Sequence, residues 1–133
     1  MDKKEEITNS LKRMGYNPVY DEDGDVKLTY QMKSIFFFPG EEDESYVSTL
    51  LPKFFDIEEG QESMALAACN KLNRELKVIK MYLDNDFKTV SCAGEFYYLN
   101  DASLEDSISK VLGLLGVAKT FFKRAFDELK VSE

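Results

Sequence analysis

Residues 62–76 read ESMALAACNKLNREL, residues 78–83 read VIKMYL, and residues 88–99 read KTVSCAGEFYYL. The first segment spaces apolar side chains three and four positions apart, which is typical of one face of an α-helix. The two later segments flank a turn at residues 84–86 and read as strands of a β-hairpin. We expect this helix and hairpin to organise the fold. The predicted apolar helix face consists of Ala65, Cys69, Leu72 and Leu76, with Leu66 on its flank.

The composition is that of a globular protein, with 44% hydrophobic and 32% charged residues among 133. This length fits one domain, residues 1–133, that can bury a core. No basic segment precedes an apolar run, and the longest uncharged apolar stretch covers residues 111–118. That is too short for a membrane span, so a cytoplasmic protein without a membrane partner is expected.

The charge and the histidine content exclude several classes of function. The net charge is −8, so phosphate backbones are repelled and nucleic acid is not an expected partner. The chain has no histidine, which removes the usual general base and the commonest zinc ligand. We therefore predict no catalytic residues, no metal and no cofactor.

The first half of the chain predicts one helix and four strands. Residues 3–14 form an amphipathic pattern that ends at Gly15 and Pro18. Strands are expected at residues 19–20, 26–32, 35–38 and 45–55, and Pro52 indicates a sheet edge or a bulge in the last of these.

Two hairpin registers assign the sheet faces. A loop at Lys33–Ser34 would pair Met32 with Ile35, turning Phe36 and Phe38 outward. The residues expected to face inward with Ile35 are Leu28, Tyr30 and Phe37. A loop at Asn85–Asp86 would pair Met81 with Val90; Ile79, Leu83, Cys92, Phe96 and Tyr98 would then face inward, and Tyr82, Ala93 and Tyr97 outward.

Capping residues are predicted for two helices. Asp56 with Glu59 could begin the central helix, and Ser103 with Asp106 the last one. The last helix carries an apolar stripe that continues past Gly113 and Gly116, which we interpret as sites of close packing on the sheet. The stripe consists of Leu104, Ile108, Val111, Leu112, Leu115, Phe122, Ala125, Phe126 and Leu129. The element order α-β-β-β-β-α-β-β-α predicts an α+β fold, an antiparallel sheet packed by helices.

The segment from Ala68 to Asn73, followed by the hairpin and the Ser103 helix, resembles a YbjN-type domain. The most recognisable piece is Asn70-x-x-Asn73, which ends a small-residue helix just before a strand, and the likeness covers nearly the whole chain. These bacterial proteins are often described as sensory or regulatory, and they resemble type III secretion chaperones in fold. The resemblance implies frequent dimerisation and a role in binding polypeptides rather than in catalysis.

Polar motifs have both structural and functional interpretations. The segment Asp21–Asp25 lacks the Gly and Glu positions of an EF-hand, and Asp23-Gly24 is typical of a hairpin turn. The loop 41–44 could bind a metal or a basic partner, but such acidic loops are usually only solvated. Cys69 and Cys92 lack a C-x-x-C spacing and are expected to be buried free thiols. Asn70 and Asn73 could recognise a ligand; we favour hydrogen bonds to backbone where the helix ends.

Five aromatic residues are the candidates for partner binding, namely Phe36, Phe38, Tyr46, Tyr82 and Tyr97. Aromatic residues are ordinary in strands, yet five on one uncovered face would form a patch worth burying. The leading hypothesis is a non-enzymatic, homodimeric protein-binding domain with a chaperone-like or regulatory role. The alternative is a small hydrolase-type enzyme that uses paired carboxylates.

Overall fold

The computed structural model describes residues 2–131 and contains three helices and six strands. The elements follow in the predicted order. They are α1 (Lys3–Arg13), β1 (Val19–Tyr20), β2 (Val26–Tyr30), β3 (Lys33–Pro39), β4 (Tyr46–Asp56), α2 (Glu62–Glu75), β5 (Ile79–Leu83), β6 (Thr89–Tyr97) and α3 (Asp101–Val131). The α+β class predicted from the sequence is confirmed.

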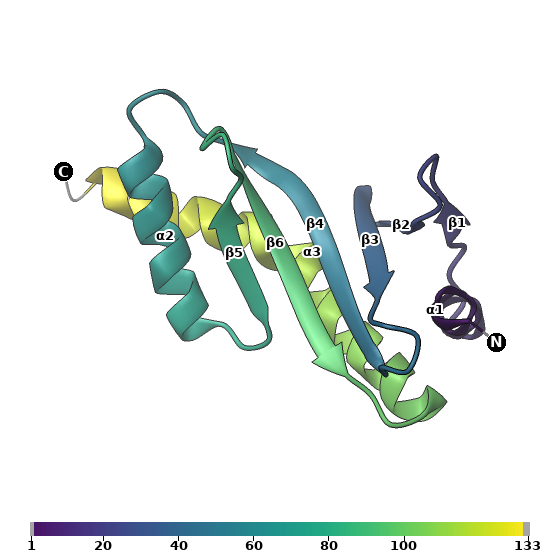
Figure 1. Ribbon diagram of the computed structural model, residues 1–133. Coiled ribbons are helices and arrows are strands. Elements are labelled where there is room, and N and C mark those ends of the chain that lie inside the picture. Colours follow the sequence, from purple (N-terminus) through teal and green to yellow (C-terminus); the bar gives the residue numbers. More distant parts are fainter. Residues whose placement is uncertain (1, 132–133) are drawn as a thin grey trace.

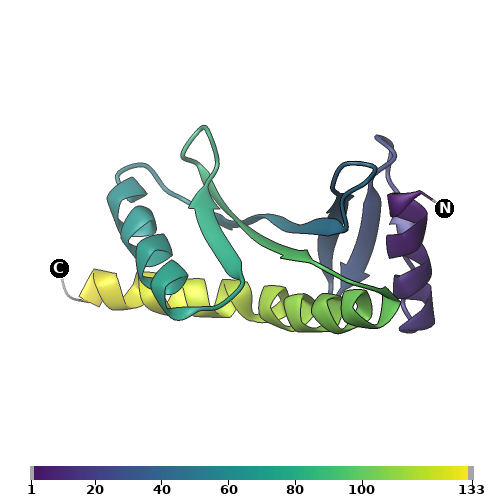
Figure 2. The same cartoon turned by 60° about the horizontal axis from the view of Figure 1, so that its bottom comes forward.

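The six strands form one antiparallel sheet in the order β1-β2-β3-β4-β6-β5. Figure 1 shows that β4 and β6 are the long central pair, although α2 and β5 separate them in the sequence. Figure 2 shows α3 running beneath the sheet, with α2 at one end of it and α1 at the other. The core lies between the sheet and these helices, and includes Phe37, Val47, Val90 and Phe122, each fully buried.

The β2–β3 hairpin turns two residues earlier than predicted. Tyr30 pairs with Lys33 and Leu28 with Ile35, so the loop is Gln31–Met32 rather than Lys33–Ser34. Met32 is therefore not inward but 97% exposed. Side chains alternate with a period of two, so a shift of two residues leaves every other face assignment in the hairpin unchanged.

The β5–β6 register differs from the prediction in the same way. Met81 pairs with Cys92 and Leu83 with Val90, so the connecting loop runs over residues 84–88. The shift is again two residues, and the residues expected inward remain on the helix side of the sheet. Ile79, Met81, Val90, Cys92 and Tyr98 are buried, while Leu83 and Phe96 are partly buried against the core.

Strand β4 lies in the middle of the sheet, so Pro52 does not mark an edge. It sits instead in a bulge, because the register shifts between Leu51 and Phe55. In this bulge Lys53 has a φ of 47°, in the left-handed region. The Lys53 amide donates a hydrogen bond to Ser91 Oγ at 2.9 Å, and Ser91 Oγ donates in turn to the Asp84 carboxylate. Ser91 Oγ thus satisfies the Lys53 amide, which the bulge removes from the ladder of strand hydrogen bonds, and Asp84 holds Ser91 in place.

The predicted caps of two helices need correction. Helix α2 begins after Gln61, which makes no side-chain capping bond, so Asp56 and Glu59 do not cap it. In α3 the cap is Asn100, whose Oδ1 accepts from the Ser103 amide at 2.9 Å. Ser103 Oγ accepts a hydrogen bond from the Asn100 amide at 3.0 Å. Ser103 is therefore the first-turn partner of the Asn100 cap and does not form a capping box with Asp106.

Two glycines set how closely α3 approaches the sheet. A Cβ on Gly94 of β6 would lie 3.1 Å from Thr49 Oγ1 and 3.3 Å from Val111 Cγ1 of α3. A Cβ on Gly116 of α3 would lie 2.9 Å from Gln31 Oε1 in the β2–β3 turn. Gly113 has no atom within 4 Å of such a Cβ, so the close-packing interpretation holds for Gly116 and is wrong for Gly113. The predicted apolar stripe of α3 faces the core, with Leu129 only partly buried.

Candidate protein-binding surface

The sheet has one face toward the helices and one face that they leave uncovered. On β3, Ile35 and Phe37 are buried on the helix side, while Phe36 and Phe38 point the other way and are partly exposed. We call this second surface the open face. It comprises Phe36, Phe38, Tyr46, Ser48, Leu50, Lys80, Tyr82, Ala93, Glu95 and Tyr97.

All five aromatic candidates lie on the open face. The rings of Phe36 and Phe38 are stacked, with centroids 6.5 Å apart. Tyr46 on β4 pairs with Tyr97 on β6, and their ring centroids are 5.1 Å apart. Tyr97 is 70% exposed and Tyr82 is 38% exposed, which is unusual for rings of this size.

A shallow depression of about 470 Å³ lies between these aromatic groups. Phe38 and Tyr82 both line it, and Leu50 and Ala93 provide apolar surface between them. Ala93 is only 5% exposed although it faces away from the helices. The depression is lined by Phe38, Ser48, Leu50, Lys80, Tyr82, Ala93 and Glu95.

A polar group of three residues lies at the centre of the open face. Tyr46 Oη donates a hydrogen bond of 2.6 Å to Glu95, and Lys80 forms an ion pair with the same carboxylate. The bonds from Lys80 and from Tyr46 lower the pKa of Glu95, while the bond to Glu95 raises the pKa of Tyr46 to about 12. Within the described part of the chain, Glu95 is the only carboxylate lining the depression, and a lowered pKa is opposite to what a general acid requires.

Lys80 and Glu95 were not among the candidates taken from the sequence. Lys80 pairs with Ala93, which places it diagonally across from Glu95 two residues along β6. Diagonal neighbours are within reach of long side chains. The predicted register was two residues away from the observed one, so this contact was not visible. A prediction with the five-residue loop 84–88 in place of the two-residue loop would have placed Lys80 next to Glu95.

The two asparagines of the sequence motif differ in position. Asn73, near the end of α2, donates from Nδ2 to the Met81 carbonyl at 3.0 Å and accepts from the Met81 amide at 2.8 Å. Met81 lies on β5, the edge strand, so this side chain occupies backbone groups that another strand would otherwise pair with. Both asparagines are exposed on α2, and within the described residues only Asn73 bonds to β5.

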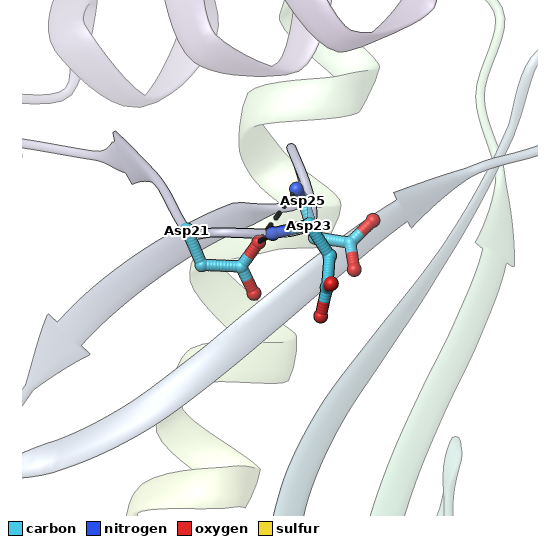
Figure 3. Close-up of side chains that lie close together, drawn as sticks. All are labelled: Asp21, Asp23 and Asp25. Carbon is cyan, nitrogen blue, oxygen red and sulfur yellow. Dashed lines mark hydrogen bonds between the residues drawn. The ribbon is translucent and has the colours of Figure 1, made fainter.

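The acidic segment Asp21–Asp25 forms the β1–β2 turn. Figure 3 shows Asp21 Oδ1 accepting hydrogen bonds from the amides of Asp23 and Asp25, each at 2.9 Å. The three carboxylates have oxygen atoms within 4.8 Å of one another. Gly24 has a φ of 80°, and its carbonyl accepts from Lys4 Nζ at 2.7 Å. These contacts account for the segment as a turn in which Lys4 offsets part of the negative charge.

Both cysteines are free and buried. Burial raises the pKa of the Cys69 thiol to about 11, and burial together with the nearby Cys69 raises that of Cys92 to about 12. Thiols with such pKa values are protonated and unreactive near neutral pH. Neither cysteine lies on the open face.

This geometry defines a class of protein: an antiparallel sheet whose helices cover one face and whose other face presents aromatic side chains. The chain belongs to the YbjN family, since the family model described as "Putative bacterial sensory transduction regulator" matches residues 3–124. No match was found among curated protein sequences. None of the helices within residues 2–131 combines the length and the apolar character needed to cross a membrane.

Solved structures share the fold at low sequence identity. Escherichia coli YbjN, described as "a putative transcription regulator", matches with a TM-score of 0.56 and 11% identity over 86% of this chain and 90% of that one. An uncharacterised protein from Methanothermobacter thermautotrophicus matches with a TM-score of 0.57 and 14% identity, over 94% of this chain and 96% of that one. A chain of the HopA1–SchA chaperone–effector complex matches with a TM-score of 0.56 and 12% identity, over 84% of this chain and 88% of that one. The resemblance to a type III secretion chaperone predicted from the sequence is thus confirmed at the level of fold.

Proposed function

We propose that this protein is a non-enzymatic binding domain of the cytoplasm that buries its open face against a polypeptide. The observation that carries the proposal is the set of five aromatic side chains on a sheet face without a covering helix. Its role is chaperone-like or regulatory, in keeping with the family description and with the likeness to SchA, which is part of a chaperone–effector complex.

The size of the open face supports this proposal. Strand β6 has nine residues and therefore extends over about 30 Å, and β3, β4, β6 and β5 side by side span about 15 Å. The projected area is roughly 450 Å², before the relief of the side chains is counted. One partner in a stable complex typically contributes about 800 Å². The open face is thus large enough to form the centre of such an interface.

The test is a pair of substitutions on the open face. Phe36→Ser with Phe38→Ser removes two rings that contact each other outside the core. If each ring contributes about 1–2 kcal/mol at the interface, the loss of 2–4 kcal/mol weakens partner binding by at least about 30-fold. Phe87→Ser is the matched control, because Phe87 is 53% exposed but lies in the β5–β6 loop, away from the open face.

Partners are captured from the native cytoplasm, identified by mass spectrometry and then titrated in purified form against the three proteins. We expect the double variant to keep its melting temperature and lose affinity, while Phe87→Ser binds like the wild type. Equal binding by all three would refute the proposal. Unfolding of the double variant would show that the two rings stabilise the core instead.

The homodimer predicted from the sequence is part of the same proposal, but with the open face as the interface instead of the alanine-rich helix. Of the alanines at positions 65, 67 and 68, Ala65 and Ala68 are fully buried within the protomer and only Ala67 is exposed, so this run offers a second copy little surface. What remains is the open face, where a second copy would compete with the polypeptide partner. Light scattering at concentrations well above micromolar gives a mass of about 30 kDa for a dimer and about 15 kDa for a monomer, twice and once the chain mass of 15.3 kDa.

A further inference from the structure

Three separate segments meet in a pocket of about 450 Å³ at one end of the open face. They are the β2–β3 turn, the bulge of β4 and the middle of α3. The turn packs against α3 near Gly116, where a Cβ would lie 2.9 Å from Gln31 Oε1 and 3.2 Å from Tyr30 Cε2. Lys119 lies one helical turn further along α3, and so it reaches the same pocket.

Among residues 2–131, three lysines and no acidic residue line the pocket. Lys33 follows the β2–β3 turn, Lys53 lies in the bulge, and Lys119 belongs to α3. Like most lysines of the described chain, none of the three forms an ion pair with a carboxylate. Lys33 Nζ donates a hydrogen bond to the Gln31 carbonyl at 3.4 Å. In a chain with 25 acidic and 17 basic residues, three lysines without a carboxylate partner in one pocket form a local positive site.

The backbone that forms the pocket adopts unfavourable conformations. Gln31, Met32 and Lys53 have φ values of 50°, 66° and 47°. They are three of the five non-glycine residues with positive φ in the described part of the chain. Gly and Asn are the residues that favour such positions in hairpin turns. Strained backbone of this kind is concentrated at functional sites.

The pocket is continuous with the open face. Phe36 pairs with Leu50 across β3 and β4 on that face. Ser34 lies two residues before Phe36 on β3, and Pro52 lies two residues after Leu50 on β4. Both are on the same side of the sheet as that pair, and both line the pocket. Met32, which is 97% exposed, and Phe54 add apolar surface beside the lysines.

We propose that the pocket formed by Lys33, Lys53 and Lys119 binds an acidic segment of the polypeptide that occupies the open face. This rests on the proposed function and specifies its partner, which carries Asp or Glu residues directly beside its apolar residues. Charge complementarity favours carboxylates here. The −8 net charge of the whole chain disfavours a long polyanion such as nucleic acid.

The experiment selects peptides from a random 12-residue display library on the wild-type protein. It repeats the selection on two charge-reversed variants. The first variant combines Lys33→Glu, Lys53→Glu and Lys119→Glu. The control combines Lys12→Glu, Lys77→Glu and Lys88→Glu, three exposed lysines that lie outside the pocket. Both variants carry the same net charge, so a difference between them reports on position alone.

We expect the wild type and the control to enrich peptides that place acidic residues next to apolar or aromatic ones, and the pocket variant to lose the acidic preference. A synthetic peptide from the wild-type selection is then titrated beside a copy with Gln for each Glu and Asn for each Asp. The acidic peptide should bind at least about tenfold more tightly at low salt, and added salt should reduce that difference.

The outcomes separate this inference from the proposed function. Apolar enrichment without acidic residues, unchanged in the pocket variant, overturns the acidic-segment proposal and leaves the open face as a binding surface. The absence of any enriched peptide argues against the proposed function itself. Loss of acidic preference in both variants would show that net charge, not the pocket, selects the peptide, and would also overturn the inference. Circular dichroism of both variants confirms that they are folded before selection.

Discussion

Asn73→Ala tests how the edge of the sheet is held. The side chain makes two hydrogen bonds to the backbone of Met81, at 3.0 and 2.8 Å. Each contributes about 0.5–1.5 kcal/mol net, so their loss costs about 2 kcal/mol. A chain of 133 residues unfolds with an entropy of about 280 cal/mol/K, and 2 kcal/mol then lowers the melting temperature by about 7 °C.

Asn70→Ala is the matched control for this substitution. Asn70 lies one turn earlier on the same helix and is exposed, so both variants gain the same helix propensity from alanine. Urea unfolding gives the difference in free energy between the two variants. Hydrogen exchange at the Met81 amide should accelerate only in Asn73→Ala. Equal stability of the two variants, with the Met81 amide still protected in both, would refute this account of the edge strand.

Three further results are expected. Gly94→Ala should destabilise the fold by about 1–3 kcal/mol because its Cβ would press against Thr49 and Val111, whereas Gly113→Ala, with free space, should stabilise α3 by about 0.5–1 kcal/mol; urea titrations measure both. Thiol titration of the reduced protein should count two cysteines only after unfolding, and a count of zero without reductant would reveal a disulfide. The raised pKa values of Cys69 and Cys92 contribute stability that is complete below pH 9 and is lost between pH 9 and about pH 11–12, since only the unfolded thiols ionise there. The free energy of unfolding, measured from pH 7 to pH 11, should therefore decrease above pH 9. A free energy that does not change with pH would contradict the burial of the thiols.

The sequence predicted the faces of the strands better than their loops. Phe36 and Phe38 are on the open face as expected, because the hairpin error was an even number of residues. Met32 was placed wrongly because Gln31 and Met32 adopt positive φ values that neither residue favours, so nothing in their identity marked the turn. Pro52 did mark an irregularity, but a bulge and an edge look the same in a single sequence.

The charged residues of the site could not be predicted for a different reason. Lys80 and Glu95 meet only in the observed register, which depends on the length of the loop after Leu83. Lys33, Lys53 and Lys119 come from three segments far apart in the chain. Their proximity follows from the packing of the β2–β3 turn and the β4 bulge beside α3. Periodicity reports the local face of a residue and contains no information on such long-range contacts.

The position of α3 has a consequence for how the protein is made. Its 31 residues run beneath the sheet from the α1 end to the α2 end (Figure 2), and its start is tied to α1 through Arg13 and Glu105. During synthesis the inward side chains of β2, β3 and β4 leave the ribosome long before α3 does. Until α3 follows, only α1 can cover part of this surface, on β3. Pairing of β4 with β6 also waits for the segment between them, so long-range contacts dominate folding and slow it. The growing chain therefore exposes apolar strand surface until α3 is made, and such surface is prone to aggregation.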